Sequence, residues 1–172
     1  MDSEIELQHA LDKYLKDVCP YVTDHLTNTS SRFIKYIKEY TTGYHADIAK
    51  CTENALYLND KNNHQILNVI TQNDIPFTSV CIHHLLPFYG VIHIKYEPNN
   101  YILGLSKFSR VCQILSNRLN IQEQFGDDIV KHLVSILQPK FLEVTIEAYH
   151  CCMSCRGIKT NAKTVTTHSY SL

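Results

Sequence analysis

The chain has 172 residues, of which 44% are hydrophobic, and its formal net charge at pH 7 is −1. This balanced charge argues against a nucleic-acid-binding protein, and no apolar run is long enough to span a bilayer. We therefore expect one soluble, cytoplasmic globular domain that binds neither nucleic acid nor membrane.

Two helices are predicted at the start of the chain. Their apolar residues recur at helical spacing, and the second helix is expected to follow capping residues at 28–31 and to end before Gly43. The two helices cover Ile5–Val18 and Phe33–Tyr40. Residues 45–65 are expected to form a polar connection to the rest of the chain.

The rest of the chain predicts strands and two more helices. Alternating apolar and polar residues indicate strands at 75–80, 88–96, 101–105, 141–152 and 163–170. The turn sequence Glu97-Pro98-Asn99-Asn100 predicts that the second and third of these strands form a β-hairpin. Helices are expected at Lys107–Arg118, capped by Ser106, and at Gln122–Gln138. Helices packed on one face of an antiparallel sheet would give the α+β class.

Two groups of cysteine and histidine residues indicate a metal site. They are Cys81-Ile82-His83-His84 and His150-Cys151-Cys152. Thiolate and imidazole groups bind zinc, and a catalytic zinc keeps three protein ligands and an open position for water. Cys81, His84 and Cys152 would provide such a set.

The strand pattern bears on which of these residues face one another. In a strand that continues to residue 152, His150 and Cys152 share a face about 6.6 Å apart, and Cys151 faces the other way. Cys152 is then expected to bind the metal while His150 reaches a substrate. Joint ligation by Cys81 and His84 requires a turn, because strand alternation would separate them.

The seven cysteines also allow structural interpretations. They could be buried apolar side chains, a disulfide framework or a closed four-ligand zinc site. The odd number and the lack of a signal peptide argue against a secreted disulfide scaffold, and a chain of this length can bury a core without cross-links. Cys19, Cys51 and Cys112 are interpreted as buried thiols. A catalytic and a closed zinc site both remain open on this pattern.

Four motifs occur in the order that is found in one enzyme family. They are Cys-x-His-His at 81–84, Gly-Leu-Ser-Lys-Phe-Ser-Arg at 104–110, Gln122-Glu123, and His-x-Cys-x-x-x-Arg-Gly at 150–157. On these motifs the chain resembles GTP cyclohydrolase I over most of its length. The resemblance implies a single domain with the tunnelling fold, its N-terminal helices at about 3–43 and its core at about 66–172. It also implies a toroidal homodecamer with active sites between subunits, and conversion of GTP to 7,8-dihydroneopterin triphosphate and formate in pterin (folate or tetrahydrobiopterin) biosynthesis.

The resemblance further implies a role for each motif residue. Zinc would be held by Cys81, His84 and Cys152 and would activate a water for attack on C8 of the purine. Three residues would take part in the chemistry: His150 as proton donor to N7, His83 in ribose opening and Ser106 in the later rearrangement. Glu123 would accept hydrogen bonds from guanine, supported by Gln122. The triphosphate would be bound by Lys107, Arg110 and Arg156, and by Arg32 and Lys35 of a neighbouring subunit.

Alternatives and departures accompany this resemblance. Ser106 can equally be a helix cap, Glu123 can stabilise a helix start, and each cation can be a solvated surface charge. The functional alternatives are a tunnelling-fold paralogue with a different purine or pterin product, and a non-catalytic binding module stabilised by zinc. Ile82 and Gln124 stand where the family pattern has Glu and Arg, and the chain stops at Leu172 before a further C-terminal helix. These departures bear on rate, specificity and assembly more than on reaction class.

Overall fold

The structure is a computed structural model that describes all residues except 1–2, 20, 22 and 61–64. The described residues form two compact units, one up to Tyr40 and one from Thr41 to Leu172. The first unit contains α1 (Ser3–Val18), the 3-10 helix η1 (Thr23–Leu26) and α2 (Thr29–Glu39). Both helices predicted at the start of the chain are thereby confirmed.

Apolar and polar contacts join α1 and α2 within the first unit. Ile34 is buried on α2, as its helical periodicity indicates. Ser30 donates a hydrogen bond to the Asp12 carboxylate, and Lys38 forms an ion pair with Glu4 at 2.9 Å. The two helices are therefore joined by polar contacts, and the apolar side chain buried on α2 is Ile34.

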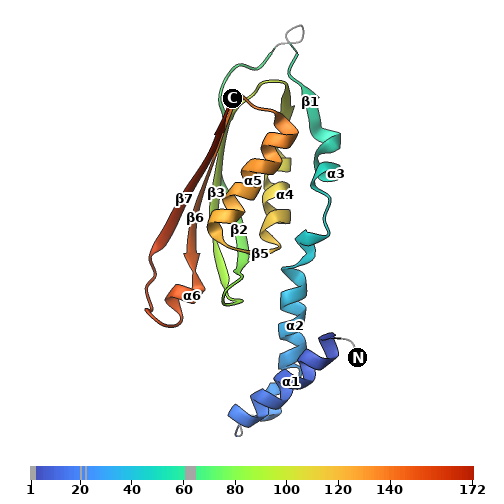
Figure 1. Cartoon of the computed structure of the whole chain (residues 1–172), viewed down its shortest axis with the longest axis vertical. Coiled ribbons are helices and arrows are strands. Elements are labelled where there is room, and N and C mark those ends of the chain that lie inside the picture. Colours follow the sequence, from blue (N-terminus) through green and yellow to red (C-terminus); the bar gives the residue numbers. More distant parts are fainter. Residues whose placement is uncertain (1–2, 20, 22, 61–64) are drawn as a thin grey trace. The chain divides into compact units, whose positions relative to one another are not determined.

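A five-stranded sheet in the order β5-β2-β3-β6-β7 organises the second unit (Figure 1). Its neighbouring strands are antiparallel, except for a short parallel pairing of β5 with β2. Two helices lie on one face, α4 against β2 and α5 against β6 and β7. The expected α+β arrangement is confirmed. The elements are β2 (Ile70–Cys81), β3 (Pro87–Glu97), α4 (Leu105–Ser116), β5 (Leu119–Asn120), α5 (Gln122–Leu137), β6 (Phe141–His150) and β7 (Lys163–Ser171).

The core lies between this sheet and its two helices. Every second residue of β6 is 0% exposed, because the period of two turns these side chains toward α5. Full burial of one such aliphatic side chain stabilises the fold by about 1.5–3 kcal/mol, so a shift of register by one residue is strongly disfavoured. The core therefore fixes the register of β6, whose last residue is His150. These β6 residues are Leu142, Val144, Ile146 and Ala148.

The predicted hairpin at Glu97–Asn100 is wrong. β3 already pairs with β2 on one side and β6 on the other, so neither of its edges is open to the next strand. That strand, β4 (Tyr101–Leu103), instead pairs with β1 (Leu56–Leu58) in a separate two-stranded sheet. Asn59 closes this small sheet: its backbone N–H donates to Asn100 O at 2.9 Å, and its side chain donates to Asn99 O at 3.1 Å.

The connection expected at 45–65 also contains regular structure. Besides β1 it includes α3 (Ile48–Thr52) and η3 (Glu53–Ala55), and η2 (Thr42–Tyr44) comes just before it. Asp47 caps α3 by accepting a hydrogen bond from Lys50 N at 3.1 Å, and Ile48 and Thr52 are buried. One turn of helix is too short to give a clear period, which is why the sequence did not reveal it. Residues 61–64 lie outside the described residues.

Two elements near the metal-binding motifs begin or end at residues that differ from expectation. α4 begins at Leu105 with Gly104 at its N-cap, so Ser106 lies in the first turn and is not the cap. β6 ends at His150, and Cys151–Ser154 form the short helix α6. A strand through residue 152 was therefore a wrong prediction. None of the described helices has the length and apolarity needed to cross a bilayer.

Candidate active site

Cys81 and His84 are brought together by a turn at the end of β2. The backbone N–H groups of His84 and Leu85 both donate to Cys81 O, at 3.3 and 2.9 Å. Leu85 has φ 53°, in the left-handed region that is costly for a residue with a bulky side chain. The chain reverses there and enters β3 at Pro87. The turn that joint ligation requires is thus present.

Cys152 reaches the same place from α6. One donor atom from each of Cys81, His84 and Cys152 lies within 4.8 Å of the others, and Cys81 Sγ is 3.7 Å from His84 Nδ1. Ligand atoms around a tetrahedral zinc, with bonds of about 2.0–2.3 Å, are roughly 3.3–3.8 Å apart. The donor types and the Cys81–His84 distance therefore fit zinc, and the set as a whole is slightly wider than this range. The predicted set converges through a helical turn, so the strand-face argument for Cys152 was wrong.

The surroundings of the two sulfurs favour a bound cation. Cys81 is buried and Cys152 is half-buried. Burial raises the pKa of the Cys152 thiol and the adjacent Cys81 raises it further, whereas Arg156 lowers it. Two thiolates within 4.8 Å of each other repel. A divalent metal ion that coordinated both would offset this repulsion. His83 lies beside the group, with its Nδ1 3.9 Å from Cys81 Sγ.

His150 is held at the end of β6 by two neighbours. Its Nε2 lies 2.7 Å from Gln122 Oε1, and its ring stacks on Phe88 with centroids 4.7 Å apart and planes at 2°. Burial lowers the pKa of His150, and the Glu123 carboxylate opposes that shift. The imidazole is thus fixed in position and its neutral form is favoured.

The short strand β5 connects the start of α5 to the turn at Cys81–Leu85. Cys81 and Asn120 are paired, and Ile82 N donates to Asn120 O at 3.1 Å. The first two residues of α5 differ sharply: Gln122 is 2% exposed, whereas Glu123 is exposed. Glu123 is therefore accessible to a ligand, and Gln122 is enclosed by its own chain.

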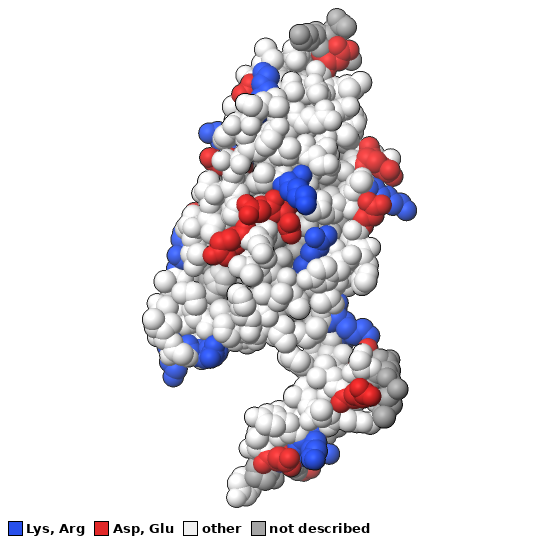
Figure 2. All heavy atoms as spheres, viewed as in Figure 1, with Lys and Arg blue, Asp and Glu red and all other residues white. Residues whose placement is uncertain are grey.

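The predicted triphosphate ligands come from several elements. On α4, Arg110 is exposed, while Lys107 Nζ donates to Cys51 O at 2.7 Å. An ammonium group has three N–H donors, so Lys107 keeps two for a ligand. Arg156 is exposed just after α6. Arg32 and Lys35 are exposed on α2, in the other compact unit. Basic and acidic side chains are interspersed on the face drawn in Figure 2.

The remaining cysteines are free thiols of differing exposure. Cys112 is 1% exposed and burial raises its pKa to about 12, as its interpretation as a buried thiol requires. Cys19 and Cys51 are only half-buried, so that interpretation was wrong for them. Cys155 completes a Cys-x-x-Cys spacing with Cys152, a pattern in the sequence that was overlooked. It is exposed and lies outside the converging donor set of the described residues.

Comparison with known proteins settles the family. The family model for GTP cyclohydrolase I matches residues 8–171. The chain belongs to the GTP cyclohydrolase I family. GTP cyclohydrolase 1 of Campylobacter curvus is 37% identical over 142 residues, which cover 83% of this chain and 72% of that protein. GTP cyclohydrolase 1 of Bacteroides fragilis is 37% identical over 146 residues, which cover 85% of this chain and 73% of that protein. GTP cyclohydrolase 1 of Rattus norvegicus is 39% identical over 142 residues, which cover 82% of this chain and 57% of that protein.

A solved structure of lower similarity also aligns with part of the chain. The archaeosine synthase QueF-like protein in its apo form aligns with a TM-score of 0.43 and 17% identity, over 58% of this chain and 91% of that chain. The family assignment depends instead on the GTP cyclohydrolase 1 relatives, whose identity to this chain is more than twice as high.

Proposed function

We propose that this protein is a GTP cyclohydrolase I, which converts GTP and water to 7,8-dihydroneopterin triphosphate and formate in the first step of pterin biosynthesis. The observation that carries the proposal is the convergence of Cys81, His84 and Cys152 in a chain of this family. His150, two residues before Cys152, supplies a proton-transfer group whose position is fixed by Gln122.

The three converging donors are proposed to bind zinc. When bound, the metal supplies an activated water for attack on C8 of the purine. Among the described residues only three donors converge, which favours an open catalytic site over a closed four-ligand one. His84 is exposed, so the site can be reached by a ligand from that side.

Three residues are proposed to act on the substrate. His150 delivers a proton to N7 as the imidazole ring opens, which suits a side chain that titrates near neutrality. His83, exposed beside Cys81, assists the opening of the ribose. Ser106, exposed in the first turn of α4, assists the rearrangement before the new ring closes.

Glu123 is proposed to select guanine. Its exposed carboxylate, in the first turn of α5, can accept hydrogen bonds from N1–H and the exocyclic amine of guanine. Adenine has no N1–H and therefore cannot complete this pair. A site that leaves a polar group without its partner disfavours the wrong ligand by roughly 1–3 kcal/mol.

The triphosphate is proposed to lie between subunits of a homo-oligomer, expected to be a decamer. Lys107, Arg110 and Arg156 would bind it from one chain, and Arg32 and Lys35 from a neighbour. β7 is the last strand of the sheet, and its outer edge has no strand partner among the described residues. An edge of this length invites pairing with another chain, which supports assembly through the sheet.

Incubation of the zinc-loaded protein with GTP tests the function. We expect formate and, after oxidation, fluorescent neopterin phosphate in equal amounts, and neither product with ATP or after zinc removal. Formate without neopterin would indicate the paralogue reaction. A folded, zinc-loaded oligomer that releases neither product would overturn the proposal and leave a binding module.

A further inference from the structure

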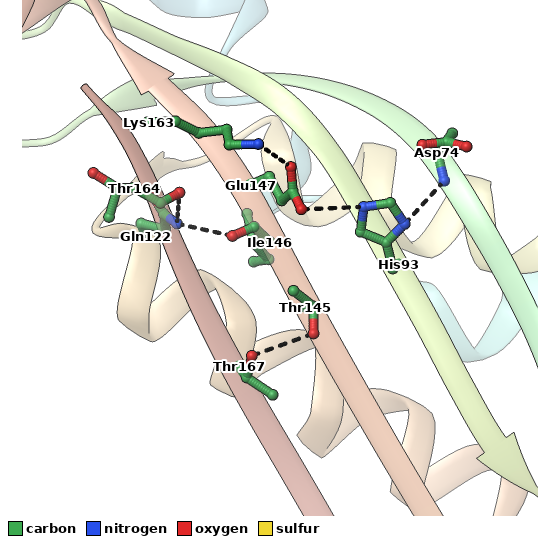
Figure 3. Close-up of polar contacts among 9 residues, drawn as sticks. All are labelled: Asp74, His93, Gln122, Thr145, Ile146, Glu147, Lys163, Thr164 and Thr167. Atoms are coloured by element: carbon green, nitrogen blue, oxygen red, sulfur yellow. Dashed lines mark hydrogen bonds and ion pairs between the residues drawn. The ribbon is translucent and has the colours of Figure 1, made fainter. Parts of the chain in front are cut away.

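The Gln122 side chain has a contact set that fixes its orientation. Its Nε2 lies 3.3 Å from each of three oxygens: Ile146 O, Thr164 O and Thr166 Oγ1. Figure 3 shows the contacts to Ile146 of β6 and Thr164 of β7. Carbonyl oxygens only accept hydrogen bonds, so the nitrogen end of the amide must face these strands. The reversed amide would place its oxygen against two carbonyl oxygens inside the core.

The oxygen end of the amide therefore faces His150. The distance from Gln122 Oε1 to His150 Nε2 is 2.7 Å, and an amide oxygen carries no hydrogen. The hydrogen of this bond must come from Nε2. We infer that Gln122 is a positioning residue that holds His150 as its Nε2–H tautomer and thereby assigns Nδ1 as the ring nitrogen that exchanges a proton with the substrate. The chemical consequence of this inference rests on the proposed function.

Two further features keep the arrangement rigid. Phe88, which is 0% exposed, stacks against the imidazole and opposes its rotation out of plane. A half-turn of the ring about its Cβ–Cγ bond would put Cε1 opposite Gln122 Oε1 and lose the hydrogen bond. Gln122 itself is only 2% exposed and contacts two strands, so it cannot follow a moving ring.

The hydrogen bonds leave Gln122 no free donor for guanine. Both N–H groups of its amide face three acceptors of its own chain, and its oxygen faces His150. Gln122 could assist Glu123 in binding guanine only if these hydrogen bonds of Gln122 broke. For the proton transfer, Nδ1 first takes up a proton from solvent water, which makes the ring an imidazolium. The Nδ1–H bond then breaks, the proton goes to N7 of the purine, and the electron pair stays on Nδ1. His150 is then left as the neutral Nε2–H form that Gln122 stabilises.

The test compares Gln122→Met with Gln113→Met, both zinc-loaded. Methionine keeps the length of Gln122 without its polar atoms, and Gln113 is an exposed glutamine of α4. Ring-nitrogen NMR of histidine-labelled protein at about pH 8, where histidine is neutral, reports the tautomer. The His150 signals are identified by their loss in His150→Ala. We expect a protonated Nε2 and a bare Nδ1 in the unaltered protein and in Gln113→Met, and mixed tautomers in Gln122→Met.

Steady-state kinetics separate positioning from base recognition. Loss of an orienting hydrogen bond commonly costs about 10- to 100-fold in activity, so kcat of Gln122→Met should fall by that factor. Its KM for GTP should change less than about twofold, and its zinc content should be unchanged. A raised KM with normal kcat would assign Gln122 to guanine binding and overturn the inference.

The unaltered protein decides the tautomer even if Gln122→Met does not fold. A protonated Nδ1 with a bare Nε2 would overturn the inference directly. The NMR measurement does not depend on turnover, so an inactive protein with the expected tautomer would refute the proposed function but not the positioning by Gln122.

Discussion

The proposed metal ligands and proton donor are positioned by contacts within one compact unit, whereas the cations proposed to bind the triphosphate come from both units. Three metal donors converge within 4.8 Å, and His150 lies 2.7 Å from Gln122. By contrast, Lys107 is engaged with a backbone carbonyl, and Arg32 lies on a different compact unit. Bond-making chemistry needs placement to within about 0.5 Å, while attraction between charges acts over many ångströms. A fold can therefore leave phosphate binding to exposed side chains and to a neighbouring subunit.

Removal of a metal ligand should have the largest effect. Cys152→Ala is expected to lose zinc and activity, because its sulfur belongs to the converging set. Cys151→Ala, its direct neighbour, should keep about one zinc per chain. Metal analysis of the two purified variants checks this pair. Equal zinc loss in both would contradict the ligand assignment.

Removal of the proton donor should come next. His150→Ala is expected to retain zinc and to bind GTP, yet to release formate about 10²- to 10⁴-fold more slowly. Zinc content, GTP titration and a formate assay on the same preparation make the comparison. Unchanged turnover in a folded, zinc-loaded variant would remove His150 from the mechanism.

Altered base recognition should have an intermediate effect. Glu123→Gln replaces an acceptor oxygen with a donor, so kcat/KM for GTP should fall by roughly 5- to 150-fold, the equivalent of one lost hydrogen bond. Gln124→Arg, at the exposed neighbouring position, should change kcat/KM by only a few-fold and should not admit ATP. If Glu123→Gln leaves GTP turnover intact, its role as guanine selector has to be abandoned.

The smallest effect is expected for an ion pair on the sheet face opposite the helices. Lys163 Nζ lies 2.6 Å from Glu147 Oε2, and His93 lies 4.0 Å from the other oxygen (Figure 3). Lys163 lowers the pKa of Glu147 below its ordinary 4.5. The pair should therefore stabilise the fold above that value and cease to do so as the pH falls through the lowered pKa.

Thermal unfolding of Glu147→Gln measures this contribution. A slightly lower Tm than that of the unaltered protein is expected at about pH 7, and the difference should vanish once the pH has fallen below the lowered pKa of Glu147. Both side chains are solvent-accessible. A large difference in Tm at neutral pH would therefore contradict the small contribution expected of an exposed ion pair.

Local sequence patterns predicted much of the fold and the residue types of the site. The alternation in β6 and the helical period of α5 reflect burial of one face, and this pattern can be read from the residue types alone. The residue types of the converging set were predictable, because few side chains bind zinc. The hairpin at 97–100 was predicted wrongly, because strand pairing depends on which edges are already occupied.

The sequence did not predict the local backbone change after His150 or the different burial of Gln122 and Glu123. The change from strand to helix after His150 moves Cys152 to the metal-binding turn, and no period marks a change over four residues. Likewise, Gln122 and Glu123 are both polar residues at a helix start, and the sequence does not distinguish them. Only the packing of α5 on β6 and β7 shows that one is enclosed and the other is accessible.

Subunit mixing tests most directly whether one chain holds the chemistry while another completes the phosphate site. Chains with His150→Ala keep Arg32 and Lys35. Chains with Arg32→Ala and Lys35→Ala keep His150 and the proposed metal ligands. Each variant alone should be nearly inactive. Random mixed oligomers formed from equal amounts should recover about a quarter of the unaltered activity, because one site in four joins two intact halves. Mixed oligomers without recovery, or a fully active monomer by light scattering, would contradict the shared site.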